Sequence, residues 1–111
     1  MTKFLVLYTS SVPATEMMAA ASPEQAQAGM EAWMAWANKN GDSIVDLGMP
    51  LGPNMHVTAG SSEPGSSQVT GFSIVEADSL EQATKMLEDH PHHSAPGAAI
   101  DVLEFLPMPG A

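Results

Sequence analysis

Two helix start signals, one in each half of the chain, constrain the fold more than any other feature. The sequence S-P-E-Q begins at Ser22, and S-L-E-Q begins at Ser79. In such a capping box the serine hydroxyl accepts from the backbone N–H of the third helical residue, whose glutamine side chain can reach back. Proline directly after Ser22 suits the first helical position. The two motifs therefore predict helices that begin at Ser22 and at Ser79.

Strand-like segments surround these two helices. Apolar or alternating runs occupy residues 4–8, 43–47, 69–77 and 100–106, and a short one occupies residues 55–58. The resulting order of strand, helix, strand, strand, helix, strand predicts an α+β, ferredoxin-like βαββαβ fold. Its four-stranded antiparallel sheet would carry both helices on one face. A length of 111 residues suits one domain, which we expect to span residues 1–111.

Helical spacing also predicts which helix residues face the sheet. One stripe of the first helix and one of the second are apolar at this spacing: Ala26, Met30, Trp33, Met34 and Ala37, then Leu80, Ala83, Met86 and Leu87. Gly41 suits the left-handed position that follows a helix. Residues 10–21 read as a connector with one helical turn at most. Residues 48–54 and 59–67 read as loops.

One face of the predicted sheet has no helix to cover it. A second copy of the chain, packed through its own sheet, is the simplest cover. The sequence therefore predicts a homodimer that pairs through this sheet face.

The charge balance excludes several classes of partner. The chain has 13 acidic and 3 basic side chains, with no arginine, and its net charge is −10. Nucleic acids and anionic membranes bind clustered lysine and arginine, so neither is expected as a partner. The absence of cysteine excludes disulfides and thiolate chemistry. The apolar run at residues 4–8 is too short for a signal peptide or a membrane span, so we expect a cytoplasmic protein.

Several stretches carry a family resemblance that covers nearly the whole chain. They are K-F-L-V-L-Y at residues 3–8, S-P-E-Q before a helix with W-M-A-W, G-M-P-L-G-P-N at 48–54, V-T-G-F-S-I-V-E-A-D-S-L-E-Q-A at 69–83, H-P-H at 90–92 and I-D-V-L-E-F at 100–105. The chain thereby resembles the YCII-related family, in its DGPF-type branch. The resemblance implies a small, cytoplasmic, ferredoxin-like dimeric α/β barrel in a family whose activities are mostly unassigned.

The resemblance does not carry a mechanism over to this chain. Some members of the family resemble enzymes that use a histidine of the first helix together with a nearby aspartate. In this chain Met30 or Glu31 stands near the histidine's place, and the D-G-P-F motif is absent. Asp46 supplies an aspartate without that partner.

Three residues are candidates for acid–base chemistry. Asp46 lies in an apolar strand, where a buried carboxyl group would have a raised pKa; on the solvent face it would be unremarkable. His56 follows the glycine- and proline-rich loop and either faces a cavity or lies on the surface. His92, directly after Pro91, is a potential general base. Together with Asp46 and His56, the pocket candidates are Tyr8, Met30 and Trp33.

A histidine cluster and a second tryptophan have competing interpretations. His90, His92 and His93 beside Asp89 could ligate a metal, but their spacing matches no complete ligand set, and a polar loop after the helix is the simpler interpretation. We therefore expect no metal and no cofactor. Trp36 flanks the apolar stripe and suits core or interface packing better than ligand stacking.

Three functional hypotheses follow from these residues. The first is a YCII-like dimer that binds or transforms a small, largely apolar molecule in a pocket between sheet and helix. The second is a non-catalytic dimeric module for interaction or regulation, favoured by the missing histidine and arginines. The third and weakest is a cofactor-independent monooxygenase. Fold alone does not choose among these hypotheses.

Overall fold

The main sheet has four strands in the order β2-β5-β1-β6. The computed structural model describes residues 1–110. The strands are β1 (Thr2–Thr9), β2 (Ile44–Asp46), β5 (Val69–Ala77) and β6 (Ala99–Glu104). Every neighbouring pair is antiparallel, and the central strands β1 and β5 are the longest. The predicted α+β, ferredoxin-like fold is confirmed.

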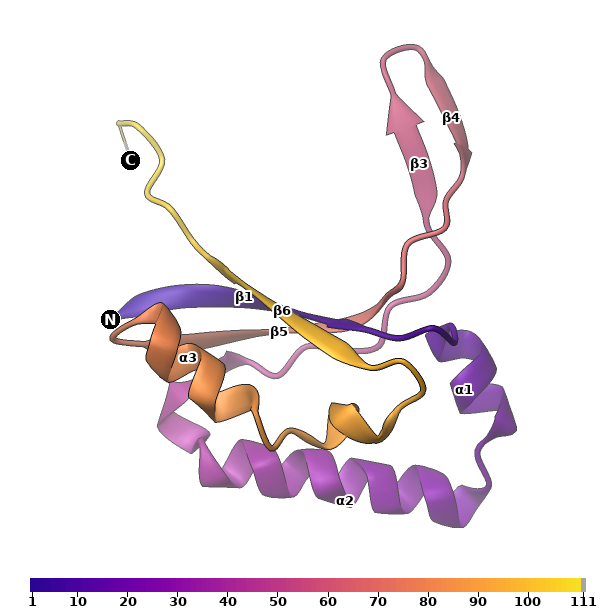
Figure 1. The fold of residues 1–111 in the computed structure, drawn as a ribbon, viewed down its shortest axis with the longest axis horizontal. Coiled ribbons are helices and arrows are strands. Elements are labelled where there is room, and N and C mark those ends of the chain that lie inside the picture. The colour runs from indigo at the N-terminus through magenta and orange to yellow at the C-terminus, as the bar shows by residue number, and fades with distance from the viewer. Residues whose placement is uncertain (111) are drawn as a thin grey trace.

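The helices lie on one side of this sheet (Figure 1). They are α1 (Ala14–Ala20), α2 (Pro23–Lys39) and α3 (Leu80–Leu87), with short 3₁₀ helices η1 (Gly41–Ser43) and η2 (Pro91–Ser94). The α1 helix is longer than the single turn predicted for this connector. In Figure 1 it lies between the end of β1 and the start of α2.

Both predicted helix starts are confirmed at the level of hydrogen bonds. The Gln25 N–H donates to the Ser22 hydroxyl at 3.1 Å, and the Ser22 N–H donates to the Gln25 side chain at 2.9 Å. The Gln82 N–H donates to the Ser79 hydroxyl at 3.1 Å. The Gln82 side chain accepts from Asp78 instead of Ser79. Each cap stabilises its helix by about 1 kcal/mol.

The face that α2 presents to the core agrees in part with the predicted apolar stripe, since Trp33 and Ala37 are half-buried against the core. Trp36 is buried, whereas Met30 is 63% exposed. The Trp36 indole N–H donates to the Met86 carbonyl oxygen of α3 at 2.9 Å, which fixes the rotation of α2. A buried indole needs such an acceptor. The hydrogen bond of Trp36, rather than the number of apolar residues in a stripe, therefore determines which side of α2 is most deeply buried.

Two further helix predictions were wrong. Gly41 does not adopt the left-handed conformation, because α2 ends on Asn40, whose N–H and side-chain amide both donate to the Trp36 carbonyl oxygen, and the chain continues into η1. Leu80 is 48% exposed. It occupies the first turn of α3, ahead of the buried residues Ala83 and Leu87.

The core lies between the inner sheet face and the helices. It contains the inward residues of the two central strands, two residues of α3 and one of α2: Phe4, Val6, Tyr8, Val75, Ala77, Ala83, Leu87 and Trp36. Alternation along β1 sends Leu5 and Leu7 to the opposite face, where they pair with Ile74 and Phe72 of β5. Within the described residues no helix covers that opposite face (Figure 1).

A separate hairpin stands away from the sheet. It consists of β3 (Met55–Thr58) and β4 (Ser61–Pro64) and is called the arm below. The short strand at residues 55–58 was predicted, but its partner lies in the segment that we expected to be a loop. In Figure 1 the arm and the chain after β6 both extend away from the side that carries the helices.

Candidate functional site

A polar chain crosses the core beneath the end of β1. The Tyr8 hydroxyl donates to the Ser73 hydroxyl at 2.8 Å, and Ser73 donates to the Leu47 carbonyl oxygen at 2.6 Å. Tyr8 and Ser73 are fully buried. Burial raises the pKa of Tyr8 to about 12, although the hydrogen bond to Ser73 opposes this shift. The phenol is therefore neutral at ordinary pH and acts as a hydrogen-bond donor.

The imidazole of His90 lies in a cage of three aromatic rings. Its ring centroid is 4.4 Å from that of Trp33, 4.5 Å from Trp36 and 4.8 Å from Tyr8. Two of these rings come from α2 and one from β1, while His90 itself follows α3 and precedes η2. The cage thus joins three segments that are distant in the sequence, and Trp33 is its one partly buried tryptophan.

The two ring nitrogens of His90 have different environments. Nδ1 accepts a hydrogen bond from the backbone N–H of His92 at 2.9 Å. The neutral ring therefore carries its proton on Nε2, the tautomer that this bond dictates. Nε2 is buried and has no hydrogen-bond partner among residues 1–110. An unpaired buried donor costs about 1–3 kcal/mol, and such groups in native structures are often functional.

The cage also keeps His90 neutral. Burial, together with the neighbouring His92 and His93 and against an opposite effect of Asp89, lowers the pKa of His90 to about 4. His90 is therefore an uncharged N–H donor at neutral pH. It is not a general base at Nε2, because Nδ1 is the nitrogen that holds the free electron pair.

The other two histidines of this turn have structural contacts. His92 is buried, and its Nε2 lies 2.6 Å from the Thr9 carbonyl oxygen of β1, to which it donates. His93 Nε2 donates to the Leu87 carbonyl oxygen at 2.8 Å. The turn is a polar loop after the helix, as the simpler interpretation predicts, but it places two imidazoles, His90 and His92, in buried positions. His92 Nε2 cannot accept a proton while it holds this bond.

The five predicted pocket residues do not converge. Tyr8 and Trp33 do meet, edge to face, with centroids 4.9 Å apart. Met30 is exposed on α2. Asp46 is exposed and accepts from the Gly48 N–H at 2.8 Å, so its carboxylate closes a turn. His56 is exposed on the arm, opposite Glu63.

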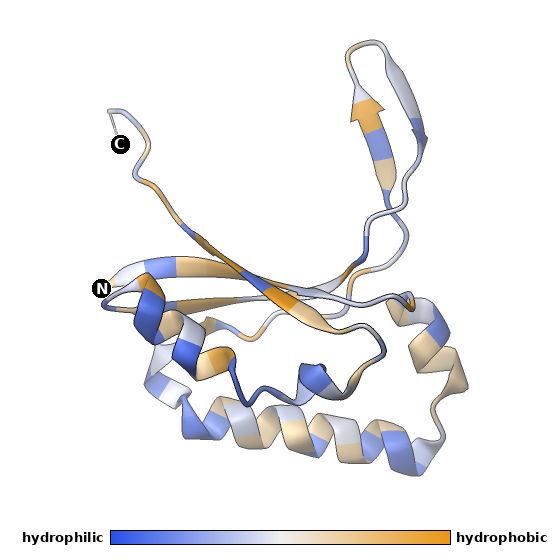
Figure 2. Cartoon of the chain, viewed as in Figure 1, coloured by the Kyte–Doolittle hydropathy of each residue, from blue (hydrophilic) through white to orange (hydrophobic). Residues whose placement is uncertain are grey.

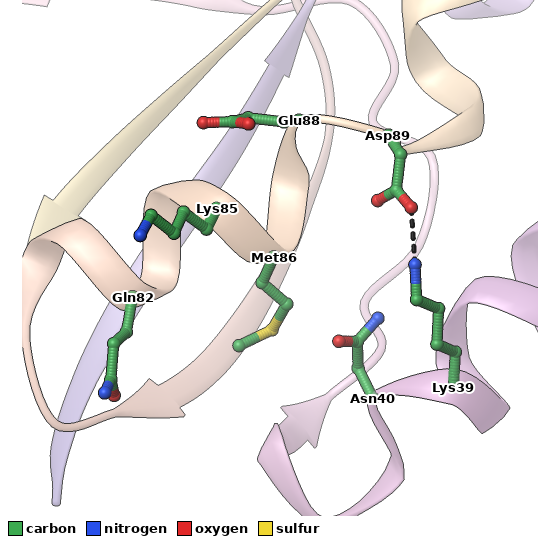
Figure 3. A pocket seen from close by; sticks show the side chains of 7 residues that line it. All are labelled: Lys39, Asn40, Gln82, Lys85, Met86, Glu88 and Asp89. Atoms are coloured by element: carbon green, nitrogen blue, oxygen red, sulfur yellow. Dashed lines mark hydrogen bonds and ion pairs between the residues drawn. The ribbon is translucent and has the colours of Figure 1, made fainter.

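Grooves occur elsewhere on the surface. One of about 530 Å³ lies between the end of α2 and α3, lined by Lys39, Asn40, Gln82, Lys85, Met86, Glu88 and Asp89 (Figure 3). Lys39 forms an ion pair with Asp89 there. The groove is open and contains charges of both signs, which gives it no clear ligand preference. It touches none of the predicted pocket residues.

Neither a metal-binding cluster nor a membrane-spanning helix is found among the described residues. Among residues 1–110, no three histidine, cysteine, aspartate or glutamate side chains are arranged to hold a metal ion. No helix in this part of the chain is both long and apolar enough to cross a membrane.

Sequence reasoning underrated three residues of the cage and its polar chain. The sequence suggests His90 only as a possible metal ligand and Trp36 only as a core or interface residue. It does not single out Ser73. The alternation of β5 contained a usable signal, since it places Ser73 on the same face as Val75, and a hydroxyl on a buried face needs a partner. The position of His90 depends on how η2 folds back under β1, which no local pattern reveals.

The fold is similar to that of a known enzyme. The chain superposes on 5-chloro-2-hydroxyhydroquinone dehydrochlorinase (TftG) of Burkholderia phenoliruptrix, solved in complex with 2,5-dihydroxybenzoquinone, with a TM-score of 0.55 and 17% identity over 94% of this chain and 93% of that one. No family model matches the chain. No curated protein matches it significantly either. The likeness supports the ferredoxin-like fold.

Proposed function

We propose that this protein binds or transforms a small, largely apolar molecule between the sheet and α2, and that His90 Nε2 donates a hydrogen bond to an oxygen of that molecule. The unpaired, buried Nε2 inside three aromatic rings carries the proposal. A ligand oxygen would remove the cost of this unpaired donor. Trp33 is the ring that would move to admit it, because it is only partly buried.

The surroundings favour a neutral ring compound with a carbonyl or phenolic oxygen. The cage offers aromatic faces and a neutral donor, and it contains no cation to balance a charged ligand. A net charge of −10 would also disfavour an anion. The quinone held by the structural neighbour shares the ring and the carbonyl oxygens of this class, although its two acidic hydroxyl groups make it an anion at neutral pH. A tie to the YCII-related family, DGPF-type branch, is part of the same proposal.

We also propose that the protein is a homodimer through its uncovered sheet face. The chain exposes 7413 Å², whereas a compact monomer of 11.6 kDa exposes about 5,800 Å². The excess, roughly 1,600 Å², is about twice what one partner buries in a standard interface. The uncovered face has an apolar centre that such an interface would bury: Leu5, Leu7, Phe72, Ile74 and Leu103.

Tryptophan fluorescence tests the ligand site directly, because both tryptophans line the cage. We expect tetramethyl-1,4-benzoquinone, a neutral probe with two carbonyl oxygens, to quench the emission saturably. His90→Asn retains an acceptor for the His92 N–H but lacks the Nε2 donor. It should weaken binding about tenfold, the effect of one hydrogen bond of about 1.4 kcal/mol.

The matched control is His56→Asn on the exposed arm, which should bind the probe as the wild type does. Circular dichroism establishes that each variant is folded. A ¹⁵N spectrum of the histidine rings provides an independent measurement, in which the probe should shift His90 Nε2. Equal binding by His90→Asn, or an unmoved Nε2 resonance at saturation, would refute the role of His90.

The alternative of a non-catalytic interaction module retains one observation in its favour. Exposed apolar side chains occur away from the sheet face, on α1 and α2: Met18, Met30 and Met34. An exposed methionine surface of this kind adapts to varied partners. Failure of every quinone or phenol probe, with a stable dimer, would favour this alternative. No contact among the described residues favours the monooxygenase hypothesis.

A further inference from the structure

The arm has no core of its own. All eight of its strand residues are exposed. A two-stranded hairpin alone is at best marginally stable in water, so a packing partner would stabilise it. The strand β3 alternates in polarity, since its sequence is Met55-His56-Val57-Thr58, and Figure 2 shows a hydrophilic band between two hydrophobic bands on this strand.

The two faces of the arm differ in polarity. Cross-strand pairing puts Met55 opposite Pro64 and Val57 opposite Ser62, which gives one mainly apolar face. The other face carries His56 opposite Glu63 and Thr58 opposite Ser61. Val57 is 71% exposed and Met55 is 58% exposed. One face is therefore suited to packing and the other to water.

Two hydrogen bonds and one close contact hold the base of the arm in place. The Gly65 N–H donates to the Asn54 carbonyl oxygen at 2.8 Å, and the Ser67 N–H donates to the Asn54 side-chain oxygen at 3.1 Å. A side chain at position 65 would collide with the Asn54 amide group. The arm is thus held in a defined direction from its base.

We propose that the arm is a clasp that packs its Met55–Val57 face against a second copy of this chain. The arm extends on the side of the sheet opposite the helices, where a partner would cover the apolar sheet face (Figure 1). The clasp is continuous with that proposed interface. Two-fold symmetry would let each copy clasp the other.

The dimensions of the chain support a second copy as the partner that packs against the arm. Its radius of gyration is 15.4 Å, against about 13 Å for a compact domain of this length. A chain that extends beyond its own core leaves contacts for a neighbour. The excess exposed surface is also larger than a standard interface needs from the sheet face alone. This inference rests on the proposed homodimer.

Two adjacent lysine substitutions test the clasp. Val57→Lys puts a charge on the apolar face, and Thr58→Lys puts the same charge on the polar face one residue away. Analytical ultracentrifugation over a dilution series measures the dimer dissociation constant. We expect Val57→Lys to raise it at least tenfold and Thr58→Lys to change it less than threefold. Both positions are exposed, so the monomer should remain folded.

The outcomes separate the clasp from the dimer and from ligand binding. A dimeric wild type whose affinity Val57→Lys leaves unchanged would overturn the clasp and leave the dimer standing. A monomeric wild type at all concentrations would overturn both. Hydrogen exchange gives a second measurement, since the arm amides should exchange more slowly at dimer concentrations than after dilution. Quinone binding by the wild type is measured separately. A failure to bind the quinone is therefore distinguishable from the absence of the clasp and from the absence of the dimer.

Discussion

At the scale of single residues, one backbone hydrogen bond determines the chemistry of His90. The His92 N–H occupies Nδ1, so a second proton on the ring would have to displace that bond. Protonation would also place a charge among three aromatic rings. Both effects act in the same direction as the burial that lowers the His90 pKa to about 4.

The free energy of unfolding should therefore decrease as the pH falls, because His90 becomes protonated in the unfolded chain while it stays neutral in the folded one. The unfolded histidine binds its proton near pH 6.5, whereas the folded one does so only near pH 4. The free energy of unfolding therefore decreases by on the order of 3 kcal/mol as the pH falls from about 6.5 to 4. It is recovered as the pH rises through the same range. Urea unfolding at several pH values measures it.

The carboxylates of this acidic chain titrate in an overlapping range, so the comparison must be made between variants. His90→Asn should show a shallower loss of stability than the wild type between pH 6.5 and 4. His56→Asn, which removes an exposed histidine, should follow the wild type. Identical pH slopes for the wild type and His90→Asn would contradict the buried neutral histidine.

Residue types alone indicated part of this site. Tyr8 is among the predicted pocket candidates, and its ring does form part of the cage around His90. Asp46 and His56 were chosen for their chemistry, but their neighbours hold them elsewhere, one in a turn and one on the arm. The position of a side chain depends on contacts between distant segments, which the type of a residue does not specify.

At the scale of elements, the turn after β2 depends on one glycine. Gly48 has φ +79°, and a Cβ there would lie 1.6 Å from the Phe72 carbonyl oxygen. Gly48→Ala should destabilise the protein by at least about 2 kcal/mol, because both the left-handed backbone and the contact oppose a side chain. Thermal or urea unfolding measures the change.

Gly52, four residues further along, is the matched control. A Cβ added to Gly52 would meet no atom within 4 Å, and the residue has no positive φ. Gly52→Ala should therefore change the free energy of unfolding by less than about 0.5 kcal/mol. A similar effect of the two substitutions would mean that the close approach of Gly48 to β5 is not maintained in solution.

Local signals predicted the helix starts and the long strands well, because caps and apolar alternation act over a few residues. They missed β4, whose sequence S-S-E-P has low strand propensity and pairs only because β3 lies beside it. They also misjudged part of the buried face of α2, which a hydrogen bond from Trp36 to α3 decides. Both failures concern contacts with another segment.

At the scale of the whole molecule, a chain with so much exposed surface should gain stability from association. For a dimer that unfolds to monomers, mass action makes the melting temperature depend on concentration. A hundredfold increase in protein concentration should raise Tm by on the order of 5 °C. Differential scanning calorimetry at both concentrations measures it. A Tm independent of concentration would contradict the dimer.

The order of the elements was enough to predict the overall architecture, since βαββαβ has one common compact solution. The same order left one sheet face uncovered, which is why the sequence also suggested a dimer. It could not locate the site. That required η2 to fold back between α2 and β1, so that His90 meets Tyr8 and both tryptophans.

The hydrogen bond from the Gly65 N–H to the Asn54 carbonyl oxygen closes the base of the arm, so the arm is a separate segment that could be exchanged. The chain leaves the domain and returns to it at one closed point, with ten residues between. Because these ten residues form a sheet separate from the four-stranded one, replacing them should leave the main sheet and the histidine cage unaltered. If the arm is the clasp proposed above, sequence changes confined to this segment should let the products of a duplicated gene lose recognition of each other while each keeps its fold.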